Sequence, residues 1–222
     1  IIENWEINGA GYGYCLYIGN TTEYFFVNNC NLHDADGVGD TIEYYYNSGL
    51  VMYNTTNANV FNNTITSNNL GLYIDIATNI SIHGNNASYN WGGIFFNHCS
   101  LLDIIDNSFY TNSNYGMHTE SSTLCQITNN NFIGHANHGV YVGPNSINNS
   151  FYHNNFINNI NNAGDQESNY WDNGYPSGGN YWSNWTTPDV LSGFNQDQVG
   201  SDGIVDNPYG IMNGGNQDNY PV

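Results

Sequence analysis

The sequence contains no lysine and no arginine, whereas average composition would give a chain of this length about 25 basic residues. Its 19 aspartates and glutamates therefore leave a formal net charge of −19. Nucleic-acid binding needs basic side chains to neutralise phosphates, and adsorption to anionic lipids has the same requirement. We therefore expect no nucleic-acid partner and no attachment to anionic membrane surfaces.

Long apolar runs are also missing, so the sequence predicts no membrane insertion. It also shows no signal peptide, and we interpret it as a processed or excised piece of a longer precursor. Cysteine is scarce, and Cys15, Cys30, Cys99 and Cys125 lack C-x-x-C spacing. Two disulfides and buried free thiols both remain open interpretations of these four residues.

What the chain does contain is a repeat of 22–24 residues. Glycines at positions 49, 71, 93, 116 and 139 each open an apolar-x-apolar segment. Alignment on them gives apolar columns, one of which reads Val27, Val60, Ile82, Ile104, Ile127, Phe151. Alternation with period two within each segment is typical of strands with one buried face.

Asparagine is the commonest residue, at 44 of 222, and it follows the same repeat. One column sits between two inward apolar positions and predicts a structural ladder of stacked amides: Asn63, Asn85, Asn107, Asn130, Asn154. Cys30 occupies the first position of this column. Seven Asn-x-Ser/Thr sequons are about as many as this composition produces by chance, so they are no evidence for glycosylation.

Short coils with turn ladders predict an all-β, right-handed parallel β-helix of about six coils. We expect the solenoid to span residues 1–162, with an insertion near 33–46. Residues 163–222 lack the repeat, hold 8 of the 19 acidic residues and are predicted to form an acidic, Gly/Asp/Trp-rich C-terminal cap.

These patterns resemble the Asn-rich parallel β-helix proteins of methanogenic archaeal cell surfaces. Such proteins are similar to the periplasmic copper-binding, nitrous-oxide-reductase-maturation repeat family. The most specific likeness lies in the tail, in the segments Gly174–Ser183, Gly200–Ile204 and Asp218–Pro221. The resemblance implies the β-helix fold and an extracellular, cell-surface location, and it implies little about activity. The scarcity of methionine and the lack of a Cys/Met/His cluster speak against the copper function here.

Two acidic segments are candidate calcium sites, because aspartates around glycine are typical of oxygen-rich loops that hold this hard cation. The stronger candidate is in the tail and comprises Asp197, Asp202 and Asp206. The weaker one lies in the insertion and comprises Asp34, Asp36 and Asp40. Solvated acidic turns are the alternative interpretation of both segments.

A column expected to face outward carries aromatic side chains suited to stacking on sugar rings or on another subunit. This candidate binding or assembly face comprises Tyr17, Tyr73, Phe95, His118 and Tyr141, with Val51 at one position. Strand-favouring residues on a partly covered face are the alternative. His135 and His138 form an H-x-x-H pair near a turn, which is a weak indication of zinc.

Catalysis by the known β-helix polysaccharide lyases needs Arg or Lys, which this chain lacks. A neutral-glycan hydrolase needs only two carboxylates, and Asp103 with Asp106 is the one candidate pair. We therefore predict a non-catalytic structural subunit of a sheath, envelope layer or filament that assembles as a homopolymer. A glycan-binding adhesin module is the alternative, and a neutral-glycan hydrolase is the third possibility.

Overall fold

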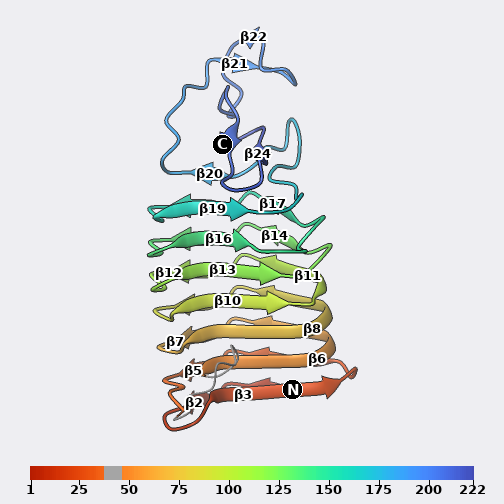
Figure 1. Cartoon of the computed structure of the whole chain (residues 1–222), viewed down its shortest axis with the longest axis vertical. Helices are drawn as coiled ribbons and strands as arrows, with labels where there is room; N and C mark the ends of the chain where they lie inside the picture. Colours follow the sequence, from red (N-terminus) through yellow and green to blue (C-terminus); the bar gives the residue numbers. More distant parts are fainter. Residues whose placement is uncertain (38–46) are drawn as a thin grey trace.

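The computed structural model describes residues 1–37 and 47–222, and these residues wind into a parallel β-helix (Figure 1). Asp40 and most of the predicted insertion lie outside the described residues. Among the described residues, no helix is long and apolar enough to cross a membrane. The all-β parallel solenoid that the repeat predicts is therefore confirmed.

The coils are built from two long sheets, followed by two small hairpins. The larger, 12-stranded sheet consists of β1 (Ile2–Glu3), β3 (Tyr14–Thr21), β4 (Phe25–Asn28), β6 (Ser48–Phe61), β8 (Leu70–His83), β10 (Gly92–Asn97), β11 (Ser100–Ile105), β13 (Tyr115–Glu120), β14 (Gln126–Thr128), β16 (His138–Val142), β17 (Ser150–Tyr152) and β19 (Asn161–Asp165). The 8-stranded sheet consists of β2 (Glu6–Asn8), β5 (Asn31–His33), β7 (Thr64–Thr66), β9 (Asn86–Ser88), β12 (Ser108–Tyr110), β15 (Asn131–Ile133), β18 (Asn155–Ile157) and β20 (Tyr181–Trp182). The hairpins are β21 (Leu191–Ser192) with β22 (Gln198–Val199), and β23 (Tyr209–Gly210) with β24 (Gln217–Asp218).

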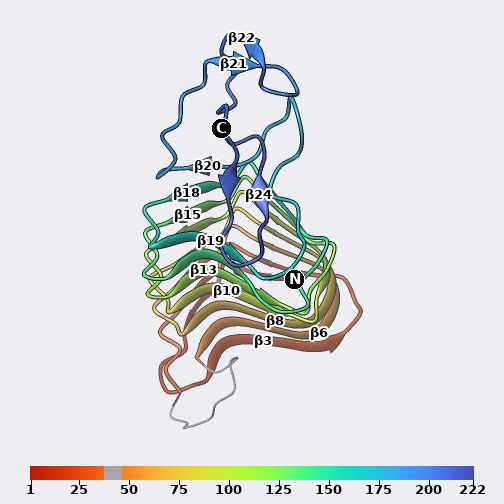
Figure 2. The same cartoon turned by 45° about the horizontal axis from the view of Figure 1, so that its top comes forward.

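Strand register follows the sequence repeat. Each long strand pairs in parallel with its counterpart one coil away, and Figure 2 shows β3, β6, β8, β10 and β13 stacked in that order. The aligned column that begins with Val27 runs through successive strand pairs to Phe151. Every member of that column is fully buried, so period-two alternation places the core inside the coils.

The solenoid is longer than the six coils expected from the sequence. Ile7 on β2 pairs with Leu32 below the first aligned coil, and Trp182 on β20 pairs with Phe156 above the last. Parallel pairing also continues past residue 162, because β19 pairs with β16. The sequence repeat fades at the C-terminal end because Trp182 replaces Phe and the spacing changes, although the backbone pairing continues.

Turn conformation explains much of the asparagine excess. Between strands, each coil turns through residues with positive φ, which cost little only for Gly, Asn and Asp. One such turn column reads Asn29, Asn62, Gly84, Asp106, Asn129, His153, with φ between 51° and 64°. The repeated demand for left-handed backbone therefore selects asparagine independently of any ligand.

The residue after this turn forms the predicted ladder. In each step the backbone N–H and Nδ2 of one asparagine donate to the Oδ1 of its counterpart in the next coil, at 2.9–3.1 Å. The Nδ2 of Asn107 also donates to the carbonyl of Ile82 in the preceding coil, at 2.8 Å. The five side chains are buried, and each of them hydrogen-bonds its own coil to the coils before and after it.

Both the ladder and the core end in the C-terminal segment. Asn180 continues the ladder above Asn154, and the Asp218 carboxylate accepts the N–H of Asn180 at 2.7 Å. The stacked rings of Phe109, Phe132 and Phe156 are likewise continued by Trp182, and Tyr209 lies on Trp182 with ring centroids 4.0 Å apart. The segment therefore completes the solenoid and covers its end.

Candidate functional site

The outward aromatic column, which we call the aromatic stripe, lies in register on the face of the larger sheet. Tyr17 pairs with Val51, Val51 with Tyr73, and the order continues through Phe95 and His118 to Tyr141. Neighbouring rings are in contact: Phe95 lies 5.7 Å from Tyr73 and 4.7 Å from His118 between centroids. The sequence thus located the stripe on one face.

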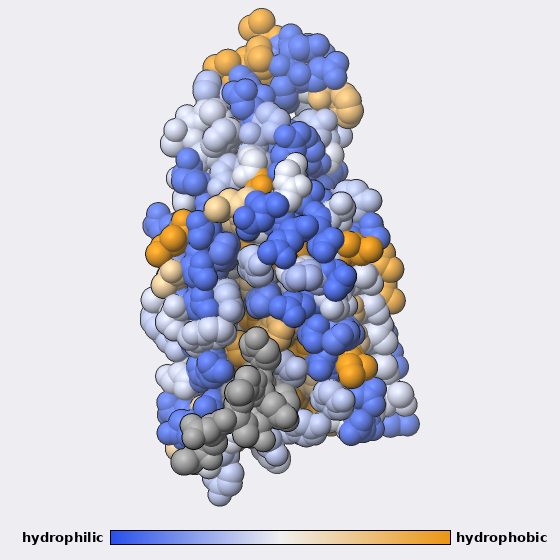
Figure 3. Space-filling view, in the orientation of Figure 1, coloured by the Kyte–Doolittle hydropathy of each residue, from blue (hydrophilic) through white to orange (hydrophobic). Residues whose placement is uncertain are grey.

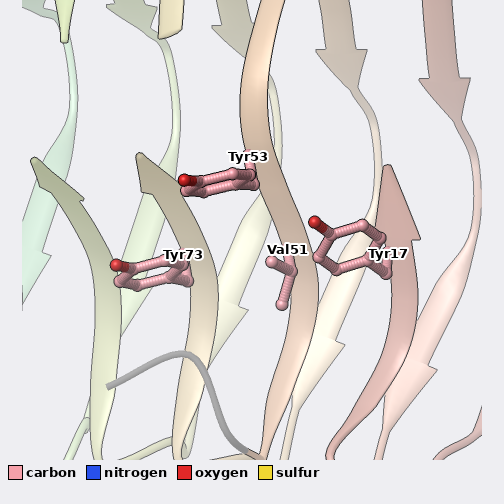
Figure 4. A pocket seen from close by; sticks show the side chains of 4 residues that line it. All are labelled: Tyr17, Val51, Tyr53 and Tyr73. Atoms are coloured by element: carbon pink, nitrogen blue, oxygen red, sulfur yellow. The ribbon is translucent and has the colours of Figure 1, made fainter. Parts of the chain in front are cut away.

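Exposure of the stripe differs from the expectation. Tyr73 is only 6% exposed and Phe95 4%, and both belong to a second apolar cluster with Val51 and Leu70. These rings are packed, so the middle of the stripe is not free to stack on a sugar. The stripe is open at its N-terminal end, where Tyr17 and Tyr53 are half-exposed and line a pocket of about 230 Å³ with Val51 and Tyr73 (Figure 4).

At the other end of the stripe, two histidines contact one tyrosine. His118 and His138 lie 5.1 and 5.2 Å from Tyr141 between ring centroids. Burial, with a smaller contribution from His138, lowers the pKa of His118 to about 4, and burial also lowers the pKa of His138. Both imidazoles are therefore neutral at neutral pH, and Glu120, 3.3 Å from the Nε2 of His118, faces an uncharged ring.

His135 does not join His138 in a metal site. It occupies the position that Asn112 holds one coil below, and its Nδ1 accepts the backbone N–H of Asn112 at 3.2 Å. The backbone N–H of His135 donates to the Oδ1 of Asn159 at 3.0 Å. His135 therefore belongs to a second ladder, between Asn112 and Asn159. The H-x-x-H pattern is therefore an accident of the repeat, with His135 facing the core and His138 on the outer face.

The four cysteines are free thiols. Cys30 takes an asparagine position: its N–H donates to the Oδ1 of Asn63 at 2.9 Å, and its thiol donates to the carbonyl of Asn28 at 3.3 Å. Cys99 and Cys125 likewise donate their N–H groups to ladder side chains of the next coil. Burial raises the pKa of both thiols to about 12, so they are protonated and inert at neutral pH.

Two buried carboxylates, Asp165 and Asp218, lie where ladders end. A third ladder runs from Cys125 through Asn149 to Asn169, each backbone N–H donating to the next Oδ1 at 2.9 Å. Asp165 accepts Nδ2 of Asn169 at 3.0 Å and the indole N–H of Trp171 at 2.9 Å. Asp218 in the same way accepts the indole N–H of Trp182 at 2.9 Å. Burial raises the pKa of both acids, to about 7 for Asp218. Both carboxyl groups thus accept hydrogen bonds from the end of a ladder and from an indole N–H.

The predicted tail calcium ligands are distributed over the loops instead of converging. Asp206 accepts the N–H groups of Val190 and Leu191, and Asp202 accepts that of Gly193. A third acid that sequence analysis overlooked, Asp189, accepts Ser201 Oγ and the N–H of Gly203. These hydrogen bonds lower the pKa of Asp189. Asp189, Asp202 and Asp206 therefore organise the backbone of this loop through hydrogen bonds.

The insertion aspartates also act locally in the described residues. Asp34 lies 2.7 Å from Nδ1 of His33, and Asp36 accepts the N–H of Gly11. Throughout residues 1–37 and 47–222, no group of three or more His, Cys, Asp or Glu side chains is placed to hold a metal ion. The calcium ligand sets expected from the sequence are therefore not assembled there.

The two aspartates of the candidate catalytic pair occupy different kinds of position, one in a turn and one on a strand face. Asp106 fills a left-handed turn position at φ 57°, as Asn62 and Asn129 do in other coils. Asp103 lies on the outer face of β11, where it lines two shallow cavities from which Asp106 is absent. Nothing in their placement gives the paired acid and base that glycoside hydrolysis needs.

Comparisons with known proteins place this chain among β-helix repeats. The model of the family described as periplasmic copper-binding protein (NosD) matches residues 2–187. A comparison with curated proteins gives no match. Two solved structures of the periplasmic alginate epimerase AlgG are similar in fold. A double mutant has a TM-score of 0.57 and 18% identity over 75% of this chain, and a single mutant has 0.58 and 16% over 90%.

The chain covers 38% and 52% of the two epimerase structures, and at this identity they show a shared fold. A copper site would need clustered imidazole, thiol or thioether ligands. The thiols of Cys99 and Cys125 are protonated and occupy ladder positions. His118 and His138 gain no third ligand within the described residues. The donor set therefore does not fit copper.

Proposed function

Because the chain belongs to the periplasmic copper-binding protein (NosD) family, we propose that it works outside the cytoplasm as a non-catalytic structural β-helix of the cell envelope. The observation that carries the proposal is the use of its acidic side chains. Asp165 and Asp218 terminate ladders, while Asp189, Asp202 and Asp206 hold loops. These five acids thus have structural roles. The periplasmic setting of the family and of the epimerase supports the location.

Self-association is part of this proposal. Within the described residues, β1, β2 and β3 each pair on one side only, whereas the C-terminal segment covers the opposite end. An edge with free N–H and C=O groups accepts another strand. Preceding coils of a longer chain or a second copy would satisfy it. We propose contact between copies at this edge, and growth into the expected homopolymer or filament needs a second contact.

Calcium enters the proposal as a screening ion. Copies of charge −19 repel one another, and divalent cations at millimolar concentration reduce that repulsion. This role requires no preformed ligand set, which agrees with the separate positions of Asp202 and Asp206. It also predicts that magnesium replaces calcium.

The two alternatives have weaker support. A glycan-binding adhesin that uses the aromatic stripe would need its rings exposed, whereas Tyr73 and Phe95 are buried. A neutral-glycan hydrolase would need Asp103 to act with a second carboxylate, and Asp106 lies in a turn outside the cavities that Asp103 lines. Incubation with neutral glycans and with alginate should yield no product if the proposal holds.

Sedimentation velocity and electron microscopy test the assembly. Tyr14→Lys places a charge on the β3 edge, and Tyr181→Lys places the same charge on the covered end; both tyrosines are exposed. We expect ordered assemblies for the wild type and Tyr181→Lys in the presence of magnesium or calcium, and loss of assembly for Tyr14→Lys. A wild type that stays monomeric at high protein concentration with calcium would refute the assembly.

A further inference from the structure

Two exposed leucines occupy turn positions that suit asparagine. Leu101 and Leu124 have φ values of 54° and 57°, and in neighbouring coils the same column holds Asn57, Asn79 and Asn148. A leucine in the left-handed region costs roughly 1–2 kcal/mol. Leu101 is 53% exposed and Leu124 59%, so burial compensates little of this cost. Backbone strain combined with exposed apolar surface is typical of a binding site.

The leucines border a shallow groove on the outer face. Two cavities, of about 390 and 340 Å³, share Asp103, so the groove runs across several coils. Successive strands of the larger sheet contribute one outward polar row, in register: Asn59, Ser81, Asp103, Gln126, Ser150. Stacked strands lie about 4.8 Å apart, so the row presents polar groups at a regular spacing along the helix axis. Tyr24, exposed, lies at one end of the first cavity.

The chemistry of the lining defines the ligand class. Amide, hydroxyl and carboxylate groups bind hydroxyls, and the leucines and Tyr24 offer apolar surface beside them. The chain has no lysine or arginine and a net charge of −19, so it repels anionic ligands. The groove lies on a sheet face, whose backbone groups are already paired, so it cannot accept a peptide as an added strand.

We propose that this groove binds a neutral oligosaccharide laid along the helix axis. Leu101 and Leu124 pack against the apolar faces of the sugar rings, while Asp103 and Gln126 bind hydroxyls. The site is separate from the aromatic stripe, and Leu101, Asp103 and Leu124 lie on later coils than the N-terminal edge, so their binding does not depend on self-association. Figure 3 shows one face of the molecule, on which small apolar patches lie among hydrophilic residues.

The decisive variant is the double substitution Leu101→Asn with Leu124→Asn. Asparagine adopts the left-handed backbone readily, and Nδ2 of Asn79 already donates to Oδ1 of Asn57 in this column at 2.7 Å. We therefore expect the variant to unfold at an equal or higher denaturant concentration than the wild type. Its affinity for the oligosaccharide should nevertheless fall about tenfold or more.

Ile76→Asn is the matched control, because Ile76 is an exposed apolar residue at φ 54° that lines neither cavity. It should stabilise the fold in the same way and retain full affinity. Binding is measured by isothermal titration calorimetry of the monomeric fraction with neutral hexasaccharides of glucose, mannose and N-acetylglucosamine. The proposal is overturned if none of them binds, or if the double variant binds as well as the wild type.

Two further probes separate the ligand classes. Hexalysine and hexagalacturonate present a cationic peptide and an anionic glycan to the same groove. We expect neither to compete with the neutral sugar, and we expect sugar affinity to be insensitive to sodium chloride. Binding of hexalysine alone, lost with salt and in Asp103→Asn, would assign the groove to a basic peptide and overturn the proposal.

Discussion

Asp218 accepts the backbone N–H of Asn180 at 2.7 Å, and this bond closes the upper end of the asparagine ladder. The same oxygen accepts the indole N–H of Trp182, whose ring continues the inward aromatic stack. Asp218 thus binds the last residue of the asparagine ladder and the last tryptophan of the inward aromatic stack. Its protonation state therefore influences the stability of the whole end.

The first prediction concerns the pH dependence that Asp218 creates. Burial raises the pKa of this acid from 3.8 to about 7 in the folded protein, so the folded state holds a proton that the unfolded state has released. The stabilisation is complete below about pH 4 and is lost as pH rises toward 7, by about 4 kcal/mol in all. Asp218→Asn should remove this decline, as measured by urea unfolding followed by tryptophan fluorescence. An unchanged slope in the variant would contradict the assignment.

His135 produces the opposite slope. Burial lowers its pKa from 6.5 to about 4, so its contribution is present above about pH 6.5 and is lost as pH falls to 4, by about 3 kcal/mol. Its buried Nε2 also has no hydrogen-bond partner among residues 1–37 and 47–222. His135→Asn restores the residue of the neighbouring coils and should raise the free energy of unfolding at neutral pH by about 1–3 kcal/mol. Lower stability of the variant at neutral pH would show that the imidazole has a partner.

Loss of a ladder amide should be costly. Asn107→Leu removes the Oδ1 that accepts two hydrogen bonds from Asn85 and the Nδ2 that donates to the carbonyls of Ile82 and Ile105. We expect a loss of about 3 kcal/mol or more in the free energy of unfolding, since several buried groups lose partners together. Asn129→Gly serves as the control, because it keeps an exposed left-handed turn and should change stability by less than about 1 kcal/mol. If Asn107→Leu proves as stable as this control, the ladder contributes nothing.

Metal ions should act on this protein without specificity. Calcium and magnesium at equal concentration are expected to raise the thermal midpoint by the same small amount, because both screen the net charge of −19. Copper should add nothing beyond this effect, since the described residues gather no set of three ligands. Differential scanning fluorimetry in chelator and in each chloride salt measures the three effects. A calcium-specific rise that disappears in Asp202→Asn would restore the tail site predicted from the sequence.

The repeat made the fold predictable, because each column of the alignment corresponds to strand register. Val27 to Phe151 and the five ladder asparagines could be placed without coordinates for that reason. The H-x-x-H spacing gave only a weak indication of zinc at His135, although counting 23 residues from Asn112 places this residue in a ladder. Asp218 was unpredictable, since it follows a non-periodic segment and meets Asn180 across 38 residues. The burial of Tyr73 and Phe95 was likewise hidden, because an outward position on a strand does not reveal what packs over it.

Each ladder asparagine makes the same hydrogen bonds to its neighbours, so the coils between them are structurally interchangeable. Asn63, Asn85 and Asn107 follow one another at intervals of 22 residues, and each presents the same acceptor to the coil before it and the same donors to the coil after it. Excision of residues 86–107 would set Asn85 beside Asn130 with matching groups. The length of such a protein can therefore change in steps of about 4.8 Å while both ends keep their own structure.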